Sequence, residues 1–210
     1  HNKDFYYIDR PYWGESRSTP YWMRCVKNEH VKTFVDHRPD DRFKNTFNDD
    51  IIPYHKNGKY VLVVPPSHAM AEMFGGKDWL HNTLKILKSS TDRELVVREK
   101  PYNPKTEIDG EGKMMPGKSA NKQPAKPFEW EQVHAVVTFN SSITIKAVTN
   151  GVPAFANFDN PCLPICEQDF SKIETPRYDD PRPVLNSLAY NQFTQEEFRN
   201  GYFMEILDGR

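Results

Sequence analysis

The sequence contains few cysteines, no long hydrophobic run and almost no net charge. Three cysteines among 210 residues are too few and too uneven for a disulfide framework, which favours a reducing compartment. No apolar run approaches the roughly 20 residues of a membrane-spanning helix. The formal net charge of −1 argues against a protein that coats nucleic acid through bulk charge. With 37% hydrophobic and 13% aromatic residues, the chain can still bury a substantial core.

Targeting and metal signals are also absent from the sequence. The first residues, HNKDFYYIDRPYWG, lack the basic, apolar and small-residue order of a signal peptide, so we expect a cytoplasmic protein. Cys162 and Cys166 are flanked by prolines and have no second Cys/His pair nearby. We therefore interpret them as ordinary thiols and expect no metal site.

Apolar runs alternate with helical patterns from residue 59 onward. The run KYVLVVPPS is typical of a strand buried on both faces of a parallel sheet. It is followed by a helical stripe of Leu80, Leu84 and Leu87. This alternation predicts an α/β fold, with a Rossmann-like parallel sheet flanked by helices. The expected strands lie near residues 60–65, 94–98, 133–139 and 152–157.

The pattern divides the chain into two regions. Residues 1–58 mix aromatic, charged and proline residues, and predict a strand at FYYID followed by irregular or helical structure. Residues 59–210 form the predicted sheet domain, which ends with a capping box of Thr194 and Glu197. Residues 103–126 lack aromatic side chains and are rich in Pro, Gly and Lys, so we expect a mobile loop that acts as a lid or binding segment.

Polar residues follow three of the predicted strands. Ligands of parallel α/β sheets bind at the carboxyl ends of the strands. Ser141 and Ser142 open a predicted helix over 142–149, where hydroxyls and helix amides favour an anion. Serine at a helix start is more often only a cap, and both interpretations stay open here. The candidate ligand-binding residues at the strand ends are Ser67, His68, Arg98, Lys100, Thr138, Asn140, Ser141 and Ser142.

Several of these motifs resemble the nucleotide-sugar half of GT-B glycosyltransferases, of the capsule-polysaccharide and CMP-sugar-dependent types. The resemblance lies in KP after one strand, SS after the next, and then a helix with Ala, Gly and Pro at the spacing of Ala147, Gly151 and Pro153. The stretch LNSLAYNQFT is similar to the tail of capsule-type proteins, and FYYIDRPYWG with YWMRCVKNEH resembles their interdomain segment, seen also in phage-encoded relatives. The similarity covers most of residues 5–205, without 103–126.

The resemblance implies a GT-B C-terminal-like domain that binds an activated nucleotide sugar and transfers the sugar to a glycan or other hydroxyl acceptor. Ser141 and Ser142 would hold the donor phosphate, and Lys100, where the family usually has His, would assist the leaving group. Glu174 would contact ribose or sugar hydroxyls. Asp9 is the candidate catalytic base, because it ends a predicted strand before the donor half. No metal or other cofactor is expected.

Two alternatives belong to other classes of function. The chain can be a non-catalytic nucleotide- or sugar-phosphate-binding module, or a phage-type enzyme that glycosylates modified DNA and works in the host cytoplasm. In the second case the lysines of 103–126 would contact DNA phosphates. About 58 residues precede the sheet domain, which is short for an acceptor domain. A homo-oligomer or a partner chain that supplies the acceptor domain is therefore a further expectation.

Overall fold

The computed structural model describes residues 3–13, 20–47, 50–98, 106–108, 114–116 and 129–209. Its central element is a four-stranded parallel sheet in the order β4-β3-β7-β8. The predicted parallel α/β fold is therefore confirmed. The strands are β3 (Tyr60–Val64), β4 (Glu94–Val97), β7 (Val133–Thr138) and β8 (Ala154–Ala156).

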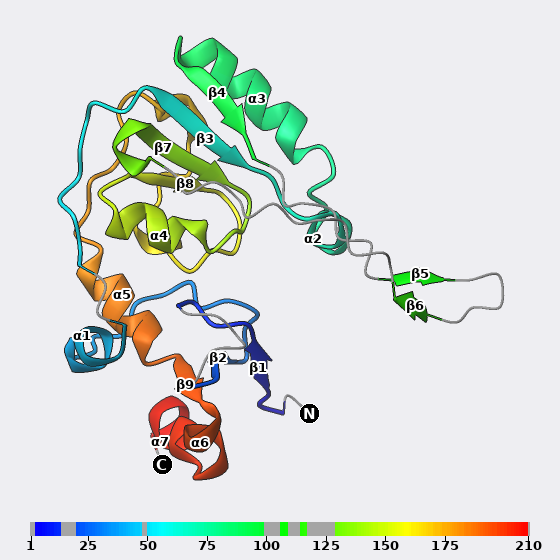
Figure 1. Cartoon of the computed structure of the whole chain (residues 1–210), viewed down its shortest axis with the longest axis vertical. Coiled ribbons are helices and arrows are strands. Elements are labelled where there is room, and N and C mark those ends of the chain that lie inside the picture. Colours follow the sequence, from blue (N-terminus) through cyan, green and yellow to red (C-terminus); the bar gives the residue numbers. More distant parts are fainter. Residues whose placement is uncertain are drawn as a thin grey trace.

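Helices cover both faces of this sheet, which explains its continuous apolar strands (Figure 1). Alternate residues of a strand point to opposite faces. Val61 and Val63 pack with Leu87 of α3 (Trp79–Ser90), and Leu62 packs on the other face with Ala147 of α4 (Ile143–Thr149). Leu80 and Leu84 join the α3 face, as the helical stripe predicts.

A second, antiparallel sheet is built from both ends of the chain. Its order is β1-β2-β9, from β1 (Tyr6–Asp9), β2 (Trp22–Lys27) and β9 (Gln192–Thr194). The segment of β2 was expected to be irregular or helical, and this expectation was wrong. Cys25 and Val26 are both buried, so β2 lacks the alternation of a half-buried strand.

The remaining elements connect and cover these two sheets. The capping box of Thr194 and Glu197 is present at α6. Of the predicted lid, only a short antiparallel hairpin lies among the described residues, so the expectation of mobility lies outside them. The helices and the hairpin strands are α1 (Asp41–Phe47), α2 (His68–Met73), α5 (Arg182–Ala189), α6 (Gln195–Arg199), α7 (Tyr202–Asp208), β5 (Thr106–Ile108) and β6 (Met114–Pro116); single 3-10 turns are η1 (Trp130–Gln132), η2 (Leu163–Ile165) and η3 (Phe170–Lys172).

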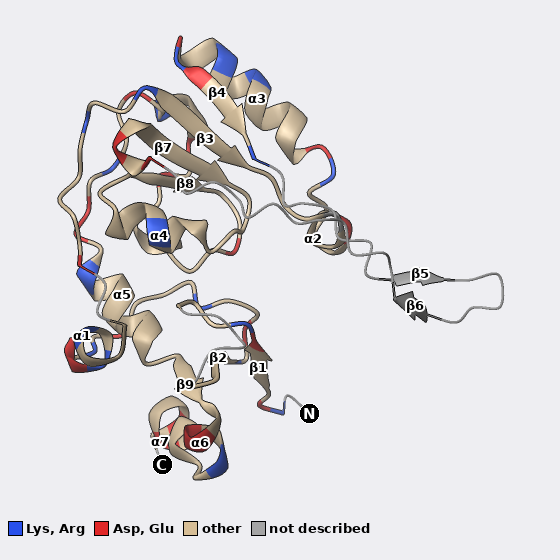
Figure 2. Cartoon of the chain, in the orientation of Figure 1, with Lys and Arg blue, Asp and Glu red and all other residues tan. Residues whose placement is uncertain are grey.

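A shared core ties the N-terminal region to the parallel-sheet half. Tyr12 and Trp13 are buried with Phe43 of α1, Ile145 of α4 and Leu185 of α5. Figure 2 shows basic and acidic residues interspersed along helices and connecting segments, in keeping with the small net charge. Within the described ranges, none of the helices has the length and apolar character that crossing a membrane requires.

Candidate functional site

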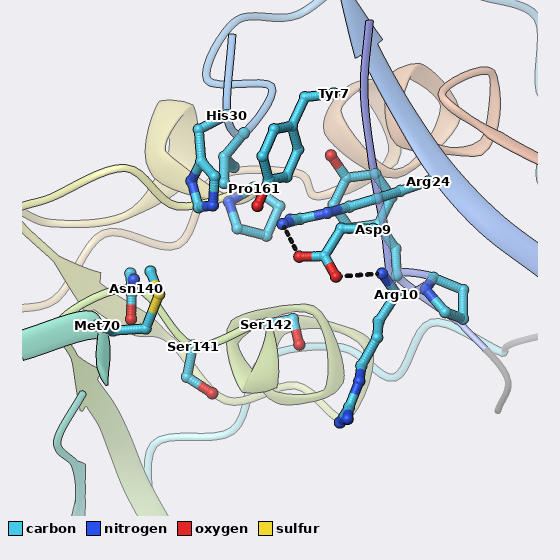
Figure 3. Close-up of a pocket in the computed structure, with 13 residues that line it drawn as sticks. Tyr7, Asp9, Arg10, Arg24, His30, Met70, Asn140, Ser141, Ser142 and Pro161 are labelled. Carbon is cyan, nitrogen blue, oxygen red and sulfur yellow. Dashed lines mark hydrogen bonds and ion pairs between the residues drawn. The ribbon is translucent and has the colours of Figure 1, made fainter. Parts of the chain in front are cut away.

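One pocket lies between the small sheet and the carboxyl edge of the parallel sheet. It has a volume of about 200 Å³ and is open to solvent. Figure 3 shows Asp9, Arg24 and His30 on one side and Ser141 and Ser142 on the other. The lining residues are Tyr7, Asp9, Arg10, Pro11, Tyr12, Arg24, His30, Val31, Met70, Asn140, Ser141, Ser142 and Pro161.

The turn from Asn140 to Ser142 is fixed from below by buried polar groups. The hydroxyl of Thr138 donates to the carbonyl of Val64 at 2.7 Å and accepts from the Ser141 amide at 3.3 Å. The side-chain amide of Asn160, which is fully buried, donates to the Ser141 carbonyl at 3.0 Å. Its oxygen accepts from the Thr144 hydroxyl at 2.8 Å. The turn is therefore held in place before any ligand binds.

Ser141 and Ser142 differ in how they relate to the helix that follows. The Ser141 hydroxyl accepts a long hydrogen bond of 3.4 Å from the Ile143 amide. Ser142 is the N-cap residue of α4, yet its side chain makes no capping hydrogen bond. It is also exposed at the pocket. Capping therefore does not account for the Ser142 hydroxyl, which is available to a ligand.

An ion pair dominates the opposite wall. The Nη2 of Arg24 lies 2.9 Å from Oδ2 of Asp9, and the Arg10 amide donates to Oδ1 of Asp9 at 2.7 Å. The Arg24 guanidinium also lies 5.7 and 5.6 Å from the ring centroids of Tyr7 and Tyr12. Such cation–π contacts hold a guanidinium in one orientation. Burial raises the pKa of Tyr12 to about 12, so its hydroxyl stays protonated.

His30 lines the same wall and is positioned by aromatic rings. Its ring lies 4.6 Å from the Tyr7 ring and 5.3 Å from the Phe74 ring, measured between centroids. Its buried Nδ1 has no hydrogen-bond partner among the described residues. Burial, followed by the positive charge of Arg24, lowers the pKa of His30 below its ordinary value of 6.5. The imidazole is therefore neutral at neutral pH.

Arg10 adds a second guanidinium at the mouth of the pocket. It follows β1 directly and is exposed. Figure 3 shows its side chain extending from the β1 end toward the turn that carries Ser142. A cation beside two hydroxyls suits an anionic group of a ligand. The pocket thus combines hydroxyls, a guanidinium and a neutral imidazole.

The structure brings four predicted site residues into this pocket: Asp9, Asn140, Ser141 and Ser142. Thr138 is fully buried and acts as a brace, so its hydroxyl is not exposed to a ligand. Ser67 caps α2 by accepting from the Met70 amide at 3.4 Å.

The structure does not place any of the three predicted basic residues, Arg98, Lys100 and His68, in the pocket. Arg98 follows β4 at the same edge of the sheet, with its amide bonded to Val63, and does not line the pocket. Lys100 and the side chain of His68 lie outside the described residues. The predicted convergence of Lys100 with Ser141 and Ser142 therefore stays a prediction.

Glu174 was predicted to contact the donor, but it lies near the amino ends of the parallel strands, and the pocket lies at their carboxyl ends. Its carboxylate accepts three hydrogen bonds from Arg93, at 2.9, 3.2 and 3.0 Å, and one from the Thr91 hydroxyl. Arg93 precedes β4 and also donates to the carbonyl of Gly58, before β3. Arg93 and Gly58 thus lie at the amino ends of β4 and β3, whereas Ser141 follows the carboxyl end of β7. Glu174 does not line the pocket.

Sequence reasoning missed three polar residues of the pocket: Arg10, Arg24 and His30. Arg24 and His30 belong to YWMRCVKNEH, the stretch that was interpreted as irregular or helical structure. A strand assignment for WMRCVK would have placed Arg24 beside Asp9, which is its partner in the register of β1 and β2. His30 carried no local signal, because it reaches the pocket from a loop.

Metal chemistry has no obvious donor set in the described part of the chain. There, no three or more His, Cys, Asp or Glu side chains cluster as metal ligands would. Cys162 and Cys166 are buried free thiols, and burial raises the pKa of Cys162 to about 12. No protein-family model matches this chain, and no curated protein matches it significantly in sequence.

Proposed function

We propose that the chain is a GT-B-related glycosyltransferase that binds an activated nucleotide sugar in this pocket. The observation that carries the proposal is the composition of the two walls. Ser141 and Ser142 lie across the pocket from a wall that holds Asp9, Arg24 and His30. Sugar transfer needs both a group that holds the donor phosphate and a group that removes a proton from the acceptor.

The phosphate-binding part consists of Ser141, Ser142 and Arg10. Hydroxyls donate to phosphate oxygens, and a guanidinium neutralises the charge that grows on the leaving phosphate as the sugar departs. Asn160 and Thr138 hold the turn rigid, so little reorganisation is needed at the moment of reaction. In this proposal protein cations take the place that a metal ion has in other transferases.

The size of the pocket defines which part of the donor it encloses. Pockets that enclose a complete drug-sized ligand measure roughly 300–1,000 Å³. At about 200 Å³, this pocket suits the sugar and its phosphate. The nucleoside would then lie outside the pocket, along the carboxyl edge of the sheet toward Arg98. An acceptor hydroxyl would approach from the side of β1.

A ligand screen followed by a turnover assay tests this proposal. CMP-, UDP- and GDP-sugars are added to the protein and the melting temperature is measured; a ligand at a hundred times its Kd stabilises the fold by about 2.7 kcal/mol. The stabilising donor is then incubated with the protein, and released nucleotide is quantified with and without glycan or duplex DNA acceptors. Stabilisation without release, with every acceptor, indicates a non-catalytic binding module. No stabilisation by any donor contradicts the proposal.

A further inference from the structure

We propose that His30, rather than Asp9, accepts the proton of the acceptor hydroxyl during sugar transfer. This inference rests on the proposed function and assigns a catalytic residue within the same pocket. Both side chains line the wall that faces Ser141 and Ser142. They differ in how strongly the rest of the protein already engages them.

Both carboxylate oxygens of Asp9 are already hydrogen-bonded. Oδ2 accepts from Arg24 at 2.9 Å and Oδ1 accepts from the Arg10 amide at 2.7 Å. Arg24 is nearly buried, with 11% of its side chain exposed, and its guanidinium packs on Tyr7 and Tyr12. Both oxygens of Asp9 are thus engaged in holding Arg24 and the Arg10 backbone in place. Asp9 is therefore better suited to orient Arg24 than to act as a base.

His30 has the opposite properties. Neutral imidazole carries one nitrogen without a proton, and this nitrogen is the acceptor that the reaction requires. Nδ1 is buried and has no partner in the described part of the chain, so Nε2 is the nitrogen that an acceptor hydroxyl can approach. The ring packs against Tyr7 and Phe74. Figure 3 shows the His30 ring on the pocket wall, on the same side as Asp9 and Arg24.

The charges around His30 suit a proton that is taken up only during the reaction. Burial and the positive charge of Arg24, on β2, keep the resting imidazole neutral. The carboxylates of Asp9, on β1, and Asp159, in the segment after β8, act on His30 in the opposite direction. They would stabilise the imidazolium ion once it forms. A base with a pKa near the working pH is the most effective in such a step.

The step is a direct displacement at the anomeric carbon of the donor. The acceptor oxygen forms the new bond to this carbon while its O–H proton moves to the unprotonated nitrogen of His30. The bond between the anomeric carbon and the phosphate oxygen breaks, and its electron pair leaves with the phosphate. Ser141, Ser142 and Arg10 receive that negative charge. The imidazolium then returns its proton to solvent.

The test compares the wild type with four variants, using whichever of the CMP-, UDP- and GDP-sugars the wild type turns over. The variants are His30→Gln, His30→Phe and Asp9→Asn, with His81→Gln on the exposed face of α3 as the control. His30→Phe keeps the aromatic packing against Tyr7 and Phe74 but has no nitrogen. General-base catalysis contributes roughly 10²–10⁴-fold, so both His30 variants are expected to lose at least about a hundredfold in kcat. Their Kd for the donor, measured by titration calorimetry, is expected to stay within about threefold of wild type.

The pH profile supplies a second readout. The kcat/KM of the wild type should fall at low pH, because His30 becomes protonated there. This fall should be absent from the residual activity of His30→Gln and present in Asp9→Asn. Nitrogen chemical shifts of the ¹⁵N-labelled His30 ring, assigned by comparison with His30→Gln, should report a neutral imidazole at pH 7. A charged ring at pH 7 would overturn the assignment.

The outcomes separate the base assignment from the proposed function. If the wild type turns over no nucleotide sugar, both proposals fail. If the wild type is active and the His30 variants keep its kcat, only the assignment of His30 fails. If Asp9→Asn loses at least about a hundredfold in kcat and the His30 variants keep the wild-type kcat, Asp9 is the base.

Discussion

Asn160 donates from its side-chain amide to the carbonyl of Ser141, at 3.0 Å, from a position that is fully buried. Its oxygen accepts from the Thr144 hydroxyl and from the Cys162 amide. This one side chain therefore joins the turn after β7, the first turn of α4 and the segment after β8. Asn160, together with Thr138, therefore fixes the turn that carries Ser141 and Ser142.

Replacing Asn160 tests that dependence. Asn160→Ala leaves the Cys162 amide without its hydrogen bond, and removes one of several hydrogen bonds at the Ser141 carbonyl and the Thr144 hydroxyl. An unsatisfied buried group costs about 1–3 kcal/mol and each other lost hydrogen bond about 0.5–1.5 kcal/mol, so we expect a loss of roughly 2–4 kcal/mol in the free energy of unfolding, measured by urea denaturation. Asn82→Ala, on the exposed face of α3, is the matched control and should change stability by less than about 0.5 kcal/mol. Equal effects of the two substitutions would contradict the bracing role.

Ser142→Ala separates ligand binding from helix capping. Because the Ser142 side chain makes no capping hydrogen bond, its loss should change stability by less than about 0.5 kcal/mol. Affinity for the bound nucleotide should fall by roughly 1.5–3 kcal/mol for each lost hydrogen bond to a charged phosphate, while affinity for the free nucleoside stays constant. Calorimetric titration with both ligands measures the difference.

Ser67→Ala is the capping control for that measurement. Ser67 does cap its helix, so its replacement should cost about 1 kcal/mol of stability and leave nucleotide affinity unchanged. If Ser142→Ala weakens nucleotide and nucleoside equally, the serine does not contact the phosphate.

Glu174→Ala tests whether this carboxylate belongs to the site. Its pairing with Arg93 is at the opposite edge of the sheet, and 42% of the Glu174 side chain is exposed. Ion pairs of this kind are worth about 0–1 kcal/mol, so a small loss of stability is expected. Nucleotide affinity should equal that of the wild type. A fall in affinity comparable to that of Ser142→Ala would return Glu174 to the donor site.

His134 should make stability depend on pH. Burial lowers the pKa of His134 below its ordinary value of 6.5, and its Nε2 donates to the carbonyl of Ile173 at 2.8 Å. Below pH 6.5 the unfolded chain binds a proton that the folded chain does not bind. The free energy of unfolding therefore decreases as pH falls from 6.5 toward the lower folded pKa, by at most about 1.4 kcal/mol per pH unit for this one group.

His134→Gln removes this titration and keeps a donor for Ile173. Urea denaturation at pH 8, 7, 6 and 5 should show a shallower decrease for the variant than for the wild type. The two curves are compared as differences from their own values at pH 8, which removes any constant cost of the substitution. Parallel curves would show that His134 does not contribute.

Gly151→Ala tests why the helix 143–149 ends where it does. Gly151 has a φ of +69°, and an added Cβ would lie 2.3 Å from the carbonyl oxygen of Pro53. Gly75 has a φ of +70° but no atom within 4 Å of an added Cβ. A left-handed conformation costs a non-glycine residue about 1–2 kcal/mol. Gly75→Ala should therefore lose about that amount, and Gly151→Ala clearly more, because the backbone must also move away from Pro53; equal losses would contradict the clash.

Local sequence patterns were enough to predict the parallel sheet. The runs at 60–65 and 133–139 are mostly apolar on both sides of the strand, with His134 and Thr138 as buried polar exceptions, because each strand is covered on both faces. The small sheet was not predictable in the same way. β2 pairs with β9 across about 170 residues, and its central position buries adjacent residues, so no local period marks it as a strand.

The candidate site likewise has one part that the sequence predicted and another that it did not. The sequence by itself determined the turn from Asn140 to Ser142, because an apolar strand followed by polar residues and a short helix places them at the carboxyl edge of a parallel sheet. It also placed Asp9 at the end of a strand. Only the tertiary structure decided that Arg24 forms an ion pair with Asp9 and that His30 enters the pocket from a loop. It also decided that Glu174 pairs with Arg93 near the amino ends of the parallel strands. These relationships depend on contacts between residues distant in sequence, and such contacts follow from packing rather than from any local pattern.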